Sequence, residues 1–273
     1  MAIQLGRYGI WKRVTDATPE LAQEGERLGY GAFWVGGSPT GDLGSVEALL
    51  DATKTIPVVT GIVNMWKDDA KTVGASYLRI ADRHPGRFLL GVGVGHPEGI
   101  PEYTRPIDKV GAYLDELGDM GIGKDALVLA ALGPVALRIA AQRTVGAHPY
   151  ITTPRHTVMA REVMGEGPVL APEQKVMLTT DAEEARQVVR ANADRYLRLT
   201  NYRRSFLREG WSTEDLDGGG SDELIDLLGL HGTIERVVAG IDAHLEAGAD
   251  HVCVQTLGDD PMGQYRALAE ALF

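Results

Sequence analysis

Short apolar runs alternate with amphipathic stretches along most of this chain. Eight runs rich in β-branched or other apolar residues are expected to form strands, at about 3–10, 32–36, 57–63, 88–94, 126–132, 145–151, 174–179 and 250–256. Helical spacing of apolar residues marks the stretches 19–28, 46–53, 70–83, 107–120, 135–143 and 182–199. Strands that alternate with helices pair in parallel, because each helix carries the chain back to the starting edge of the sheet.

Eight such units in 273 residues predict an α/β fold, a single (β/α)8 TIM barrel spanning 1–273. An open flavodoxin-like or Rossmann sheet is the alternative. Two segments are longer than a minimal barrel needs, and we expect them to be insertions after strands 6 and 7. They are 152–172 and about 201–247, the second with the run Asp217-Gly218-Gly219-Gly220. Such insertions often cover or shape a site.

Composition narrows the class of protein. The formal charge is −11 and no basic stripe is present, which argues against nucleic acid or an anionic membrane as the main partner. The first residues lack a signal-peptide pattern, so we expect a soluble, cytoplasmic enzyme. The one cysteine, Cys253, excludes an intramolecular disulfide and alternates with neighbours as a buried strand residue would.

The run Gly91-Val92-Gly93-Val94-Gly95-His96 follows an apolar strand. Its G-x-G-x-G spacing differs from the G-x-G-x-x-G of dinucleotide-binding folds. Glycine at alternate strand positions lets a flat ligand approach the backbone, although tight packing inside the barrel is an equal explanation. His96 is the candidate proton donor, since its ordinary pKa suits proton transfer; a surface histidine is the other interpretation.

Two other strand ends carry candidate binding groups. Asn64 ends an apolar strand, and barrel enzymes place their chemistry at such ends. Leu132-Gly133-Pro134-Val135 joins a strand to a helix, where free amides and the helix dipole favour an anion such as phosphate. Each segment is also compatible with an ordinary strand end or turn. No histidine spacing indicates a metal, and no G-x-S-x-G indicates a serine hydrolase.

Several segments, in order along nearly the whole chain, resemble the luciferase-like oxidoreductases. They are Leu5–Trp11, Leu28–Gly36, Thr60–Asn64, Pro85–Phe88 and Ala247–Val252. Leu132–Pro134 and Gly146–Tyr150 are similar to segments of a shorter subgroup of F420-dependent oxidoreductases. The order of these segments carries the resemblance, since no single motif is decisive.

The resemblance implies a cofactor ring at the C-terminal mouth of the barrel and a cofactor phosphate at a helix start. It places Gly61, Ile62 and Asn64 by the ring, and Gly93, Val94, Gly95 and His96 around ring and tail. It places Leu132, Gly133, Pro134 and Val135 around the phosphate, with Gly37 and Ser38 lining the opening. It also implies a cis peptide between Gly61 and Ile62 that backs one face of the ring, and a homodimer.

The expected activity is hydride transfer between C5 of coenzyme F420 and a small organic substrate with an electron-poor C=C, C=O or C=N bond. One alternative is an FMN-dependent monooxygenase on the same fold. Another is a non-catalytic flavin-binding protein. Substrate identity and the direction of transfer are not determined by the sequence.

Overall fold

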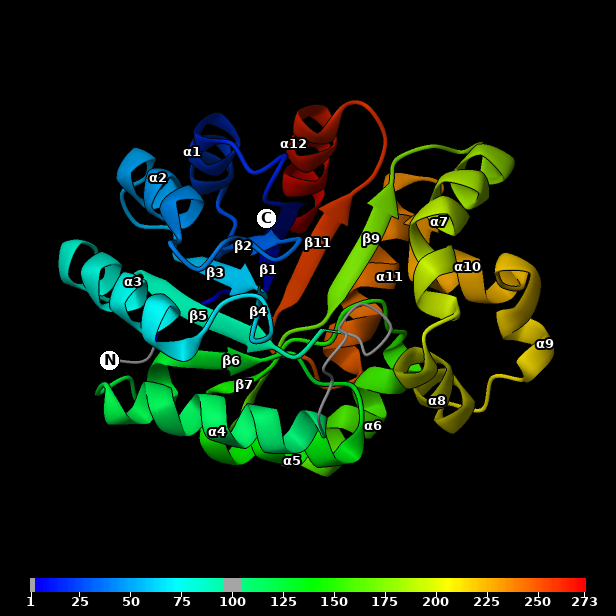
Figure 1. The fold of residues 1–273 in the computed structure, drawn as a ribbon. Coiled ribbons are helices and arrows are strands. Elements are labelled where there is room, and N and C mark those ends of the chain that lie inside the picture. The colour runs from blue at the N-terminus through cyan, green and yellow to red at the C-terminus, as the bar shows by residue number, and fades with distance from the viewer. Residues whose placement is uncertain (1–2, 96–104) are drawn as a thin grey trace.

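The computed structural model describes residues 3–95 and 105–273, which form a ring of parallel strands surrounded by helices (Figure 1). The strands are β1 (Tyr8–Arg13), β2 (Phe33–Gly36), β3 (Val58–Gly61), β4 (Val63–Asn64), β5 (Phe88–Gly93), β6 (Leu127–Leu129), β7 (Gly146–Ala147), β8 (Val169–Leu170), β9 (Glu173–Met177), β10 (Gly229–His231) and β11 (Val252–Thr256). Every strand pair is parallel, as the alternation of strands and helices predicts.

The ring closes through one interrupted strand, β8 with β9. β8 pairs with β7, whereas β9 pairs with β11. Between them, the Ala171 N–H donates to Ala147 O at 2.9 Å, and the Cys253 N–H donates to Pro172 O at 2.9 Å. Pro172 has no N–H for a ladder bond, so the pairing partner changes at this residue. The barrel expected from the sequence is therefore confirmed.

Except for α2, the helices of the barrel begin where the sequence supplies a side-chain cap or a proline. They are α1 (Pro19–Leu28), α2 (Gly44–Ala52), α3 (Ala70–Arg83), α4 (Pro106–Asp119), α5 (Pro134–Arg143), α6 (Pro154–Met164), α11 (Ile234–Glu246) and α12 (Pro261–Leu272). The Thr18 hydroxyl accepts from Leu21 N before α1, and Pro19 occupies the first helical turn. None of the described helices is long and apolar enough to cross a membrane.

Apolar side chains pack in two places around the strands. Those that point outward, such as Ile10, Phe33 and Leu90, pack under the helices in the largest core cluster. Those that point inward fill the lower barrel, and Trp11, Trp34 and Val59 are among them. Cys253 is fully buried in this inner cluster, as its alternation with neighbours predicts.

The long segment after β9 builds a separate helical layer beside the barrel (Figure 1). It comprises α7 (Ala182–Leu197), α8 (Thr200–Arg208), α9 (Thr213–Leu216), the 3-10 turn Asp217–Gly219 and α10 (Asp222–Leu228). These helices share their own apolar cluster, which includes Val189, Phe206 and Leu224. The shorter segment 152–172, also expected to be an insertion, consists of α6 and β8.

Some boundaries differ from those expected. The first strand begins at Tyr8 and not near residue 3, because Gly6 has φ +65° and interrupts the extended backbone. Strand β10, three residues long within 201–247, was not foreseen. It pairs with the C-terminal half of β9. Its shortness explains the omission, since three residues give no detectable periodicity.

Candidate active site

The Trp11–His148 pair forms the floor of the barrel mouth, and the Trp34–His251 pair lies beneath it, with the Trp34 ring stacked on the His148 ring. The Trp11 indole donates from Nε1 to His148 Nε2 at 3.3 Å, and His148 Nδ1 lies 2.7 Å from Ala171 O. Trp34 donates in the same way to His251 Nε2 at 3.0 Å. Because an indole N–H only donates, each Nε2 is an acceptor and each histidine is neutral with its proton on Nδ1. Burial lowers the pKa of His148 and of His251 to about 4, consistent with neutral rings.

Gly61 and Ile62 lie directly above this floor, half-exposed at the mouth. A Cβ on Gly61 would lie 3.0 Å from both Trp11 Nε1 and His148 Nε2, so glycine makes room for the two rings. The peptide bond between Gly61 and Ile62 is cis, which confirms the expectation from the family resemblance. The position of a cofactor ring beside it remains a prediction.

The glycines of β5 allow close packing inside the barrel. This favours the packing interpretation of the glycine run over the approach of a flat ligand. A Cβ on Gly91 would lie 1.7 Å from Thr60 O, and one on Gly93 would lie 3.0 Å from the Ile62 side chain. Gly93 thereby brings Ile62 against the end of β5. Val94 and Gly95 are half-exposed at the mouth, and His96 lies outside the described residues.

The remaining candidates near β2 and β4 shape turns at the mouth. Asn64 is 9% exposed, and its Oδ1 accepts from Trp66 N at 2.9 Å. Its amide nitrogen faces Gly95, where an added Cβ would lie 2.6 Å away. Gly37 and Ser38 follow β2 with φ of +76° and +58°. The structure thus places these residues at the rim, and a ligand contact from them remains a prediction.

The segment Leu132–Val135 forms the start of α5, with Gly133 as the N-cap and Pro134 in the first turn. No side chain caps this end, so the amides of Val135 and Ala136 have no partner within the helix. The Arg208 guanidinium of α8 lies 3.6 Å from the position that a Gly133 Cβ would take. Arg208 was not singled out in the sequence, because its proximity depends on how the helical layer folds back.

Two buried side chains lie near the same helix start. The His156 Nε2–H donates to Leu132 O at 2.9 Å, and Ser205 lines the adjacent small cavity with Arg208. Within the described part of the chain, neither His156 Nδ1 nor Ser205 Oγ has a hydrogen-bond partner. The Arg208 cation, the amides at the start of α5 and the Ser205 hydroxyl, which can donate, together make this a place where an anion fits.

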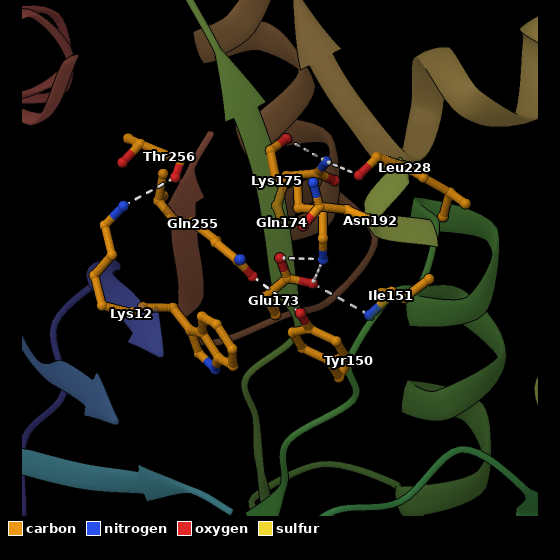
Figure 2. Close-up of polar contacts among 12 residues, drawn as sticks. Lys12, Tyr150, Ile151, Glu173, Gln174, Lys175, Asn192, Leu228, Gln255 and Thr256 are labelled. Carbon is orange, nitrogen blue, oxygen red and sulfur yellow. Dashed lines mark hydrogen bonds and ion pairs between the residues drawn. The ribbon is translucent and has the colours of Figure 1, made fainter. Parts of the chain in front are cut away.

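A buried polar cluster on the opposite side of the mouth was missed by the sequence analysis (Figure 2). Lys175 Nζ contacts Glu173 Oε1 at 2.9 Å, and both side chains are 1% exposed. Burial lowers the pKa of Lys175 and raises the pKa of Glu173, while the ion pair opposes both shifts. The Lys175 ammonium also lies 4.2 Å from the centre of the Tyr150 ring. The available signal was the charged pair inside strand 173–177, which an ordinary packed strand does not carry.

The sequence has no matching family model and no matching curated protein. Solved structures do match it over almost their whole length. An F420-dependent secondary alcohol dehydrogenase in complex with an F420–acetone adduct has 14% identity and a TM-score of 0.76, with 97% of each chain covered. The coenzyme F420-dependent tetrahydromethanopterin reductase from Methanopyrus kandleri has 15% identity and a TM-score of 0.70, with 97% of this chain and 96% of that chain covered.

A flavin enzyme matches equally well. The oxygenating constituent of 3,6-diketocamphane monooxygenase from Pseudomonas putida, in complex with FMN, has 15% identity and a TM-score of 0.72, covering 98% of this chain and 96% of that chain. At these identities the likeness concerns the fold. The chain therefore has the barrel fold that F420-dependent and FMN-dependent enzymes share, consistent with the luciferase-like superfamily that its sequence resembles.

Proposed function

We propose that this protein is an F420-dependent oxidoreductase of the luciferase-like superfamily. It would transfer a hydride between C5 of the deazaflavin and a small organic substrate at the C-terminal mouth of the barrel. The similar folds of an F420-dependent dehydrogenase and an F420-dependent reductase support the class of reaction. The family resemblance of the sequence supports F420 as the cofactor.

The observation that carries the proposal is the anion site at the start of α5. Free amides of Val135 and Ala136 and the guanidinium of Arg208 surround Gly133, and their geometry suits a phosphate group. In this assignment Leu132 and Pro134 shape the turn, and Gly133 leaves its backbone open to the anion. The ring would lie above Gly61 and Ile62, near Val94 and Gly95.

Titration of the apoprotein with F420, followed by fluorescence, tests the proposal. Gly133→Val would crowd the approach of a phosphate to the amides and should weaken F420 binding at least tenfold. Gly123→Val is a matched control, because Gly123 is also an N-cap with extended backbone and nothing lies within 4 Å of its added Cβ. Equal affinity of the two variants, both folded, would refute the phosphate assignment.

FMN is the second candidate, with a monooxygenase activity. It is favoured by the structural match to a monooxygenase in complex with FMN, and the anion site at α5 would receive its phosphate equally well. The same titration with FMN separates the two. Binding of FMN at lower concentration than F420 would replace the first proposal with this one.

We also propose that the protein is a homodimer in the cytoplasm, as the family resemblance implies. The helices next to the second and third strands, α2 and α3, are the expected contact, and Leu78 of α3 is 43% exposed there. Light scattering at micromolar concentration should give twice the chain mass of 29.4 kDa. A stable monomer would exclude the dimer.

A further inference from the structure

We propose that Tyr150 binds the substrate, and that its hydroxyl protonates the oxygen of a planar ketone while the reduced cofactor supplies the hydride. This inference rests on the proposed function, since the structure's own residues provide no reductant. It deepens that function by naming a substrate class and a proton donor. Tyr150 belongs to the polar cluster of Figure 2, in which Glu173 and Lys175 form a buried ion pair.

Tyr150 lies at the mouth, across Trp11 from the Gly61–Ile62 bulge. Trp11 Nε1 lies 3.0 Å from the position of a Gly61 Cβ, and the Trp11 ring centre lies 5.0 Å from that of Tyr150. The Tyr150 side chain is half-exposed, in contrast to the buried Glu173 and Lys175 beside it. A substrate next to a ring placed over Gly61 would therefore meet Tyr150.

Aromatic rings form the wall around this position. Tyr196 of α7 lies 5.4 Å from the Tyr150 ring, and Tyr202 of α8 lies 5.2 Å from Tyr196, both measured between ring centres. The barrel thus contributes Trp11 and Tyr150, and the helical layer contributes the other two rings. A wall of aromatic faces favours a flat, largely apolar ligand.

The polar groups at this position donate hydrogen bonds. The Tyr150 hydroxyl donates to Gln255 Oε1 over 3.2 Å, a long bond that a better-placed acceptor can replace. The carboxylate of Glu173 is already occupied, since Lys175 donates to both of its oxygens and Ile151 N donates to Oε2 at 3.2 Å. Arg13, exposed at the end of β1, is a further donor on this side. Donors at this position can bind a ligand oxygen such as a ketone carbonyl.

Burial and the Glu173 carboxylate raise the pKa of Tyr150 well above its usual value, so the phenol keeps its proton until a ketone oxygen is in place. In the reduction the hydride forms a C–H bond at the carbonyl carbon, the C=O π bond breaks, and the oxygen takes the Tyr150 proton; the product is an alcohol and the cofactor is oxidised. The charge left on the phenolate spreads into the ring, and the Lys175 ammonium 4.2 Å from the ring centre attracts it. Solvent then returns the proton to Tyr150.

The test uses the holoenzyme and acetophenone as the probe ketone. Tyr150→Phe keeps the ring and removes the hydroxyl, so kcat for acetophenone reduction should fall about 100-fold and the solvent isotope effect on kcat should vanish. Cofactor affinity should stay within about twofold of wild type, since the anion site at α5 is unchanged. Tyr77→Phe is the matched control. Tyr77 lies on α3 and packs on Phe88 of β5, in the core between the helices and the strands and away from the mouth.

Three results would overturn the inference. One is a Tyr150→Phe enzyme with wild-type kcat and isotope effect. Another is a wild-type holoenzyme that binds cofactor but does not reduce acetophenone. The third is loss of the isotope effect in His96→Gln and its retention in Tyr150→Phe, which would make His96 the donor. Failure of the wild-type protein to bind either F420 or FMN is a different outcome, because it refutes the proposed function itself.

Discussion

At the scale of single residues, the barrel contains charges where such folds usually hold apolar side chains. Glu173 and Lys175 are two residues apart on β9, so both point into the barrel, and each is 1% exposed. Placing two ions in the interior costs desolvation energy, and their attraction recovers it only while both are present. The pair is thus a costly way to fill the barrel, and we propose that it serves the acid function of Tyr150.

The desolvation cost of these two buried charges predicts the result of a double-mutant cycle at Glu173 and Lys175. Glu173→Gln or Lys175→Met alone should lower the free energy of unfolding by about 3–5 kcal/mol, because each leaves one buried charge unpaired. The double variant should lose far less than the sum of the two. Urea denaturation of the three variants measures this; additive losses would contradict the interpretation.

Residue-level prediction from sequence worked for conformation and less well for contacts. Gly61 and Ile62 were expected to form a cis peptide, and the bond is cis. Cys253 was expected in a buried strand and is there. Glu173 and Lys175 were missed although their spacing within one strand was a signal, and Tyr150 was missed because sequence spacing does not show its contact with Lys175 across the barrel.

At the scale of elements, the helical layer α7–α10 completes the mouth of the barrel. Its α8 brings Arg208 to the start of α5, its Tyr196 packs on Tyr150, and Tyr202 packs on Tyr196. Elements far apart in sequence thus meet at both proposed binding positions. The sequence indicated that 201–247 would shape a site, but periodicity within each helix does not determine where that helix packs.

The role of α8 is tested through its arginines. Arg208→Gln should weaken F420 binding about 10–100-fold, since it removes one hydrogen bond between charged partners. Arg204→Gln, also exposed on α8, removes the same charge away from Gly133 and should leave affinity nearly unchanged. Fluorescence titrations at two salt concentrations compare them. Equal losses in both variants would indicate a general charge effect.

At the scale of the whole molecule, four buried histidines are held neutral. Burial lowers the pKa of His148, His156 and His251 to about 4, and that of His244 to about 3. His156 lies on α6 and His244 on α11, while His148 follows β7 and His251 precedes β11, so their protonation opposes the fold as a whole. Glu209 has the opposite effect on stability as the pH falls, because burial raises its pKa to about 7.

These pKa shifts determine how the stability of the fold changes with pH. Between pH 6.5 and about 4 the unfolded chain binds protons at these histidines and the folded chain does not, so stability falls as the pH falls. By pH 5 each histidine lowers the free energy of unfolding by about 2 kcal/mol, whereas Glu209 raises it by about the same amount. The urea midpoint should therefore be clearly lower at pH 5.0 than at pH 7.5. An equal or higher midpoint at pH 5.0 would contradict the assignment of neutral rings.

The central claim is that the barrel mouth holds F420, and native mass spectrometry of the protein from an F420-producing host tests it most directly. The account predicts a species heavier than the chain by the mass of F420, lost in the Gly133→Val variant and retained in Gly123→Val. A species carrying FMN, or a bare chain that still shows no mass shift after F420 is added, would contradict it.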